Sequence, residues 1–241
     1  MVNDQRVIIL FVKYPEKGRV KTRLARSLGD DAAVKIYCQL VSRLVRMLRE
    51  VSVEEVRVCY DPSEKRQQIE AWLRPIWLDA GEVLASEEVS NKEPALVFRP
   101  QCEGDLGARL QLAFSQVFEE NESSGVPESQ VLTIGSDCIE IDGQTFQEAW
   151  KSLEEKDVVF GPTFDGGYYM VGMNSSYPDI FENIPWSSET TMEVSLQRAL
   201  ESGLDVALLD EKHDIDTEED WRRAELKFSL SDWGDQGDAS V

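Results

Sequence analysis

Short apolar runs of strand length alternate along this chain with longer segments of helical periodicity. The expected strands cover residues 7–12, 55–60, 95–98, 131–134, 158–160, 168–171 and 206–209. The expected helices cover residues 31–50, 64–73, 105–119, 143–153, 188–201 and 217–230. Because parallel neighbouring strands need crossover connections, this alternation predicts an α/β fold, with a mostly parallel mixed sheet between two layers of helices.

Length and composition favour one domain. The 241 residues can bury a sizeable core, and no composition break, Ser/Gly linker or repeat divides the middle of the chain. We therefore expect a single domain over residues 1–231. Residues 232–241 contain three aspartates, two glycines and little to bury, so they are expected to form a flexible acidic tail.

The sequence lacks the signals of membrane insertion and secretion. Its longest apolar run is far shorter than the roughly 20 residues that a membrane-spanning helix needs. Residues 1–6 lead directly into the first expected strand, and no small-residue cleavage site follows. The four cysteines are scattered without a C-x-x-C pair. These features predict reduced thiols and a cytoplasmic location.

The charge is unevenly distributed. The formal net charge of −21 argues against a nucleic-acid partner, because binding nucleic acids depends on clustered Lys and Arg. Residues 1–50 nevertheless carry a net charge of +6, whereas residues 51–241 carry −27. With a screening length of about 8 Å at physiological salt, a small anion near the N-terminal part is affected mainly by the local cations. A phosphate-sized ligand is therefore allowed.

In open α/β sheets, ligands bind beyond the carboxyl ends of the strands, and the first such loop here is basic. Residues 13–23, the basic segment, contain one acid, Glu16, and five cations: Lys13, Lys17, Arg19, Lys21 and Arg23. Such a segment ahead of a helix is typical of a phosphate site, with Lys13, Gly18, Lys21, Thr22 and Arg23 as candidate nucleotide-binding residues. The alternative is a solvated basic turn. The glycines of a Walker loop and of a G-x-G-x-x-G motif are missing.

Two aspartates follow other expected strands. Asp137 comes directly after the apolar run 131–134, and Asp216 follows the last strand. Carboxylates at such positions suit Mg²⁺ or Mn²⁺, and Mg²⁺ usually shares one or two carboxylates with substrate phosphates. The alternatives are an Asp137 that caps a turn and an Asp216 on a solvated face. Thr217 and Asp220 have the spacing of a capping box, which predicts a structural role for both.

Two glycine-rich loops give further candidates. Asp165, Gly166 and Gly167 form an ordinary hairpin-turn sequence, but glycines also let the backbone approach a ligand, and Asp165 is the candidate catalytic base. Asp105 is either a helix cap or a contact to a base or ribose. The single histidine excludes a His-rich zinc site, and it leaves a Cys138/His213 hydrolase as an unfavoured alternative.

Together the motifs resemble a family of bacterial nucleotide-diphosphosugar transferases of the glycosyltransferase-A type, which includes radical-SAM-associated members. The motifs occur in the family's order, as Phe11-Val12-Lys13-Tyr14-Pro15, Lys21-Thr22-Arg23-Leu24, Gly104-Asp105-Leu106-Gly107 with Arg109, Gly135-Ser136-Asp137-Cys138, Gly161-Pro162, Asp165-Gly166-Gly167-Tyr168-Tyr169, Pro185-Trp186-Ser187 and Asp214-Ile215-Asp216-Thr217. Two positions depart from the family pattern, since Ile139 and Glu218 stand where the family often has Pro.

The resemblance implies a Rossmann-like nucleotide-diphosphosugar transferase fold. It also implies that Lys13, Lys21 and Arg23 bind phosphates and that Asp137 and Asp216 bind Mg²⁺ or Mn²⁺, giving Asp137 a part in catalysis. The implied reaction moves a sugar from a nucleotide-diphosphate donor to an unknown small-molecule or lipid acceptor. The basic segment also resembles that of phospholactate guanylyltransferases, so nucleotidyl transfer is an alternative. A nucleotide-binding protein without turnover is a third, and the sequence does not predict the oligomeric state.

Overall fold

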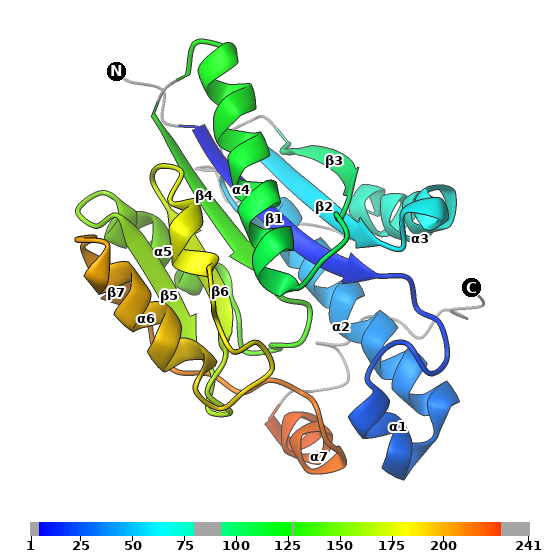
Figure 1. The fold of residues 1–241 in the computed structure, drawn as a ribbon. Helices are drawn as coiled ribbons and strands as arrows, with labels where there is room; N and C mark the ends of the chain where they lie inside the picture. The colour runs from blue at the N-terminus through cyan, green and yellow to red at the C-terminus, as the bar shows by residue number, and fades with distance from the viewer. Residues whose placement is uncertain (1–4, 80–92, 127, 228–241) are drawn as a thin grey trace.

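The computed structural model describes residues 5–79, 93–126 and 128–227. Its strands form one seven-stranded sheet in the order β3-β2-β1-β4-β6-β5-β7 (Figure 1). The strands are β1 (Gln5–Lys13), β2 (Glu55–Asp61), β3 (Ala95–Pro100), β4 (Ser129–Ile134), β5 (Val158–Pro162), β6 (Tyr168–Met173) and β7 (Val206–Leu208). β6 runs antiparallel to β4 and β5, and all other pairs are parallel. The expected mostly parallel mixed sheet is confirmed.

Helices cover both faces of the sheet. The helices are α1 (Thr22–Leu28), α2 (Asp30–Glu50), α3 (Arg66–Leu78), α4 (Leu106–Ser123), α5 (Gly143–Leu153), α6 (Thr191–Glu201) and α7 (Glu218–Lys227), with short 3₁₀ turns η1 (Ser63–Lys65) and η2 (Pro178–Phe181). Alternate residues of β1 point to opposite faces. Ile8 and Leu10 pack with α2, α3 and α5, whereas Val7 and Ile9 belong to the cluster with α4, η2 and α6. The expected three-layer arrangement is confirmed.

A third apolar cluster lies outside the two sheet faces and positions the loops at one edge. Leu24 of α1, Ile36 of α2 and Ala224 of α7 pack there with Ile139 and Ile215. Ile139 follows β4 and Ile215 precedes α7, and both are buried. The cluster therefore holds two loops that are distant in sequence against the N-terminal helices.

Several helices have boundaries that differ from the expectations, and α4, for example, continues to Ser123 rather than 119. Helix α1 was not predicted; it is short, and its N-cap, Lys21, has a left-handed backbone (φ 46°) with no side-chain cap. Helix α3 continues to Leu78 with Pro75 inside it, and its last turn buries Trp77. Helix α6 begins at Thr191 rather than 188, because the Thr191 hydroxyl donates to backbone oxygens that precede the helix.

Helix α7 begins at Glu218 rather than 217. Residues 228–230 of the expected last helix, and the expected tail at 232–241, lie outside the described residues. Within the described part of the chain, no helix combines the length and the apolar character needed to span a membrane.

Candidate functional site

The sheet reverses its strand order beside β1. The chain builds β2 and β3 on one side of β1 and then returns to place β4 on the other side. The carboxyl ends of β1 and β4 therefore flank a crevice at a topological switch point, where open α/β sheets bind ligands. Isolated bridges between Cys138 and Asp214 and between Thr163 and Lys212 join further loops to this edge.

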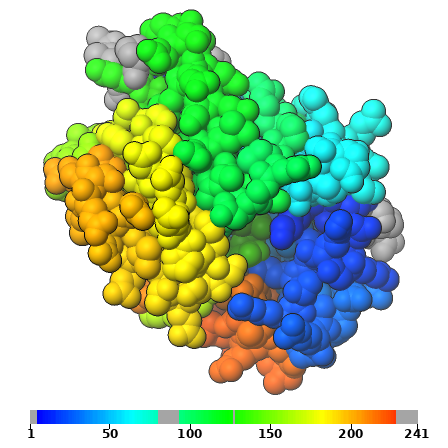
Figure 2. Space-filling view, in the orientation of Figure 1, coloured from blue at the N-terminus to red at the C-terminus, as the bar shows by residue number. Residues whose placement is uncertain are grey.

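A cleft with a volume of about 650 Å³ lies at this crevice. It opens near the centre of Figure 2, where blue, green, yellow and orange surfaces meet. The basic segment contributes Lys13, Arg19, Val20, Lys21, Thr22 and Arg23 to its wall, and the loops after β4 and β7 contribute Gly135, Ser136, Asp137 and Asp216. The structure thus brings together most of the cationic and acidic residues that the sequence analysis selected.

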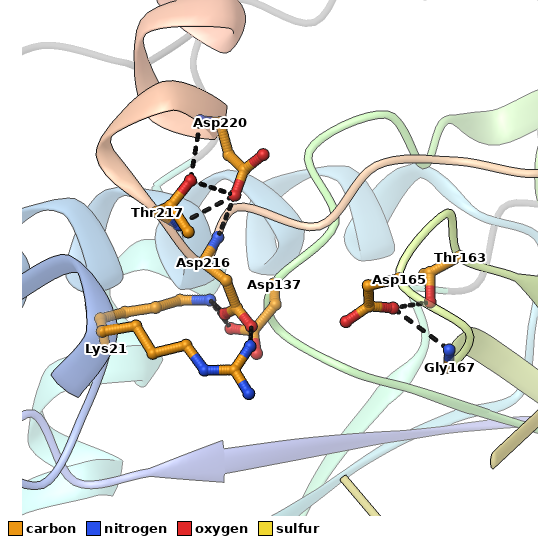
Figure 3. Close-up of polar contacts among 9 residues, drawn as sticks. Lys21, Asp137, Thr163, Asp165, Gly167, Asp216, Thr217 and Asp220 are labelled. Carbon is orange, nitrogen blue, oxygen red and sulfur yellow. Dashed lines mark hydrogen bonds and ion pairs between the residues drawn. The ribbon is translucent and has the colours of Figure 1, made fainter. Parts of the chain in front are cut away.

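Lys21 is the centre of the charged contacts in this cleft (Figure 3). Its ammonium Nζ lies 2.6 Å from Oδ1 of Asp137 and 3.2 Å from Oδ1 of Asp216. Burial alone would lower the pKa of Lys21, but the attraction of these carboxylates outweighs it and the pKa is raised. The buried side chain, only 3% exposed, is therefore charged. Arg23 reaches Asp216 from the exposed side, at 3.4 Å.

A capping arrangement fixes the backbone of Asp216. The carboxylate of Asp220 accepts hydrogen bonds from the backbone N–H groups of Asp216 and Thr217, and from the Thr217 hydroxyl at 2.7 Å. The backbone N–H of Asp220 donates in return to the Thr217 hydroxyl. The expected structural role of Thr217 and Asp220 is confirmed, and it leaves the Asp216 carboxylate to face the cations.

The loop of Asp137 is tied to the same segment. The backbone N–H of Ile215 donates to the Asp137 carbonyl at 3.0 Å. Asp214, whose backbone forms the bridge with Cys138, has a buried Oδ1 with no hydrogen-bond partner within the described structure. Burial, and then the charge of Asp137, raise the pKa of Asp214 well above its usual value. Burial therefore shifts this third carboxyl toward its protonated form relative to an exposed aspartate.

The donor set fits a divalent cation that is shared with a phosphate. Asp137 and Asp216 contact the same ammonium, so their carboxylates already converge on one position for a cation. No group of three or more His, Cys, Asp or Glu side chains suited to a metal occurs among the residues described. Two carboxylates with the remaining positions left to substrate oxygens and water is a usual arrangement for Mg²⁺.

The glycine-rich loop at residues 165–167 forms a tight turn outside the wall of the cleft. Oδ1 of Asp165 accepts hydrogen bonds from the Thr163 hydroxyl at 2.6 Å and from the Gly167 N–H at 3.1 Å. Gly166 has a φ of +88°, and a Cβ there would lie 1.9 Å from the carbonyl oxygen of Glu189. The turn and this close packing account for both glycines. The Asp165 charge still acts toward the site, as one cause of the raised pKa of Asp214.

Two other candidates have local structural roles and do not line the cleft. Asp105 is the N-cap of α4, and its carboxylate accepts from the Ala108 N–H at 2.9 Å. Of the two readings given for Asp105, the structure confirms the helix cap. Gly18 is exposed, with a φ of +74° that L side chains rarely adopt. Its place in the fold is a turn of the basic segment.

The structure also adds residues that the selection missed. Arg109 donates to Oε1 of Gln101 at 2.8 Å, and the Gln101 amide donates to the Cys59 carbonyl at 2.7 Å. Tyr37 exchanges hydrogen bonds through its hydroxyl with the backbone N–H and carbonyl of Lys13. All but Cys59 line the cleft. Only Arg109 had a signal in the sequence, since it follows the Gly104–Gly107 motif.

Cys138 and His213 do not form a nucleophile and base. Cys138 is buried, and burial raises the pKa of its thiol to about 12, so the thiolate is disfavoured at neutral pH. The His213 ring instead stacks on Phe164, with ring centroids 4.0 Å apart. The hydrolase alternative has no support.

Comparison with known proteins agrees with this fold. The family model described as "Uncharacterized protein conserved in bacteria (DUF2064)" matches residues 44–188. No curated protein matches the chain significantly. The crystal structure of a "putative nucleotide-diphospho-sugar transferase" from Desulfovibrio desulfuricans G20 is 29% identical with a TM-score of 0.74, and the match covers 89% of this chain and 83% of that chain.

Two more distant structures share the fold alone. A cytidylyltransferase from Leptospira borgpetersenii serovar Hardjo-bovis is 12% identical, with a TM-score of 0.56, over 96% of this chain and 90% of that one. The 4-diphosphocytidyl-2C-methyl-D-erythritol synthase of Anaerococcus prevotii DSM 20548 is 11% identical, with a TM-score of 0.52, over 93% and 99%. The expected nucleotide-diphosphosugar transferase fold is confirmed.

Proposed function

Since this chain belongs to the DUF2064 family of proteins conserved in bacteria, and its fold is that of nucleotide-diphospho-sugar transferases, we propose that it is a metal-dependent glycosyltransferase. It would move a sugar from a nucleotide-diphosphate donor to a small-molecule or lipid acceptor. The general kind, a transferase acting on a nucleotide-activated substrate, has the support of the comparisons. Glycosyl transfer and the metal are our proposal.

The observation that carries the proposal is the meeting of cations and carboxylates at the switch-point cleft. Lys21 lies between Asp137 and Asp216, and Lys13, Arg19 and Arg23 line the same wall. A departing nucleoside diphosphate gains negative charge as the glycosidic bond breaks. Opposite charges about 4 Å apart at an effective dielectric near 20 attract by about 4 kcal/mol, so such cations lower the barrier substantially.

Asp137 and Asp216 are the residues that would hold Mg²⁺ or Mn²⁺. When bound, the cation would neutralise diphosphate charge as a Lewis acid. The chain's own part is to supply Lys13, Lys21 and Arg23 to the phosphate oxygens, and to hold Asp216 through the cap formed by Asp220. We propose Asp165 as the base that accepts the proton of the acceptor hydroxyl.

The test is a product analysis with purified protein. Nucleotide sugars of each base are incubated with and without Mn²⁺, and both nucleoside diphosphate and pyrophosphate are measured. The proposal expects metal-dependent release of a nucleoside diphosphate from one donor class, stimulated by an acceptor extract. Nucleotide binding without any consumption of donor would favour the binding protein without turnover.

Nucleotidyl transfer is the second candidate, and the density of the basic segment favours it. Four of its cations, Lys13, Arg19, Lys21 and Arg23, line the cleft, and this amount of positive charge also suits a triphosphate. In that reaction a phosphate of the acceptor attacks the α-phosphate of a nucleoside triphosphate and displaces pyrophosphate. Metal-dependent release of pyrophosphate from a triphosphate, with no diphosphate released from nucleotide sugars, would establish this candidate instead.

A further inference from the structure

The ammonium of Lys21 occupies the position that a cation between Asp137 and Asp216 would take. It contacts Oδ1 of each carboxylate, at 2.6 Å and 3.2 Å, and its side chain is 3% exposed. Since the ammonium forms ion pairs with both carboxylates, its positive charge already compensates much of the negative charge of the pair. A second cation at the same position meets direct repulsion.

The backbone conformation of Lys21 is a second, independent observation that its surroundings fix this residue in place. Its φ of 46° and ψ of 45° are left-handed, a conformation that residues other than Gly, Asn and Asp seldom adopt. Strained backbone of this kind persists only where the surroundings fix it, and it is common at functional sites. Here the two ion pairs are the contacts that fix the side chain.

We propose that Lys21 is a resident counter-cation that excludes a divalent cation from Asp137 and Asp216 until a nucleotide phosphate draws the ammonium away. This inference rests on the proposed function, since it assumes that both ligands enter this cleft. The basic segment provides the alternative position, because a diphosphate beside Arg19 and Arg23 offers the ammonium new oxygen partners. Binding of the nucleotide and of the cation is then coupled.

The proposal predicts an effect opposite to that of an ordinary binding residue. Lys21→Met removes the competing charge, so it should increase the affinity for Mn²⁺ in the absence of nucleotide, by about tenfold or more. The same change should weaken nucleotide binding, because a phosphate contact is lost. Mn²⁺ alone is the probe, and the free ion is counted by electron paramagnetic resonance during a titration of the full chain.

Arg23 provides the matched control. It also contacts Asp216, at 3.4 Å, but its side chain is 61% exposed, so solvent screens it. Arg23→Met should change Mn²⁺ affinity by less than about threefold. Lys21→Arg, which keeps the charge, should bind Mn²⁺ as weakly as the unaltered protein. If the thermal melt shows that Lys21→Met is unfolded, Lys21→Gln replaces it, since the glutamine amide can still donate to either carboxylate.

The outcomes separate this inference from the proposed function. An Mn²⁺ affinity of Lys21→Met equal to or below that of the unaltered protein overturns the inference. If the unaltered protein still releases nucleoside diphosphate only with Mn²⁺, the proposed function stands without it. If neither protein binds Mn²⁺, with or without a nucleoside diphosphate, the inference and the metal part of the proposed function fail together. Adding Asp137→Asn to Lys21→Met should abolish the gain.

Discussion

Four of the aspartates at this edge of the sheet divide into two pairs by their partners. Asp105 and Asp220 accept hydrogen bonds from backbone N–H groups at helix starts, so their carboxylates serve the fold. Asp137 and Asp216 instead face the cations Lys21 and Arg23. The carboxylates of Asp137 and Asp216 line the cleft and face its cations, so they are the ones that a bound cation could share. The hydrogen-bond partners thus distinguish the helix-capping aspartates from the two that we propose as metal ligands.

The replacement Asp137→Asn tests whether the negative charge of Asp137 is needed to bind the metal. Its carboxylate is 42% exposed and contacts Lys21 and the Ser136 hydroxyl, with Asp216 left to pair the buried ammonium. We therefore expect the loss of metal-dependent nucleotide binding with a small change in the thermal melt of the ligand-free protein. Calorimetric titration of a nucleoside diphosphate with and without Mn²⁺ measures the first effect.

A large drop in the melting temperature of Asp137→Asn would instead support the interpretation of Asp137 as a turn cap. Ser136→Ala is the control for the local turn, because it removes the hydroxyl contact and keeps the carboxylate. Its metal-dependent binding should equal that of the unaltered protein.

The replacement Asp165→Asn distinguishes two roles for Asp165, that of a catalytic base and that of a turn residue. The asparagine side-chain oxygen can still accept from the Thr163 hydroxyl and the Gly167 N–H, so the turn should remain. The amide cannot accept a proton, and loss of a general base typically lowers the rate by about 10²- to 10⁴-fold. We expect the rate of transfer to fall within that range while donor affinity stays unchanged. A variant that transfers normally would show that Asp165 serves the turn alone.

Local hydrophobic periodicity in the sequence predicted the strands and all but one of the helices. Every expected strand is present, because short β-branched runs bounded by turns leave few other conformations. Helix α1 escaped prediction, since a seven-residue helix with a left-handed N-cap carries no capping signal. The contact of Lys21 with Asp216 joins residues 195 apart in sequence, and no local pattern reports it. The sequence therefore predicted individual candidate residues, whereas only the folded structure shows which of them lie together.

The carboxylate of Asp220 caps the start of helix α7, and its removal can be tested. Asp220→Ala removes the acceptor for three donors at the start of α7, and loss of a helix cap typically destabilises by about 1 kcal/mol. Because the backbone of Asp216 loses its anchor, Mn²⁺-dependent nucleotide binding should weaken as well. Urea unfolding and the same calorimetric titration measure the two effects, and Arg222→Ala, on an exposed ion pair of α7, is the control.

The pH dependence of this cap follows from the pKa of Asp220. Burial would raise that pKa, but hydrogen bonds from Thr217 and Asp216 outweigh it and lower the pKa below its usual 3.8. A carboxyl with a lowered folded pKa stabilises the fold above the unfolded value and loses this contribution as the pH falls through the folded value. The unfolding free energies of Asp220→Ala and the unaltered protein should therefore differ at pH 7, and the difference should shrink as the pH falls below about 3.8 and through the lower folded pKa. A difference that persists at low pH would show that the stabilisation does not depend on the negative charge of Asp220.

For the molecule as a whole, the cleft that we propose as a nucleotide site lies on a strongly acidic protein. The net charge is −21, yet residues 1–50 carry +6 and contribute the basic segment to the cleft. A nucleotide approaching from a distance is repelled by the whole molecule and attracted only when it is near the cleft. The two fields have different ranges, so salt should affect them differently.

This difference in range predicts an unusual salt dependence for nucleotide association. Between about 0.01 M and 0.1 M salt the screening length falls from about 30 Å to 10 Å, which removes the distant repulsion before the local attraction. The association rate constant of a nucleoside diphosphate should therefore rise or stay constant over this range, whereas electrostatically attracted ligands associate more slowly as salt increases. Stopped-flow fluorescence with a labelled nucleoside diphosphate measures the rate. A steady fall with salt would mean that the basic segment dominates the field at every distance, and that the carboxylates of residues 51–241 have no influence on ligand approach.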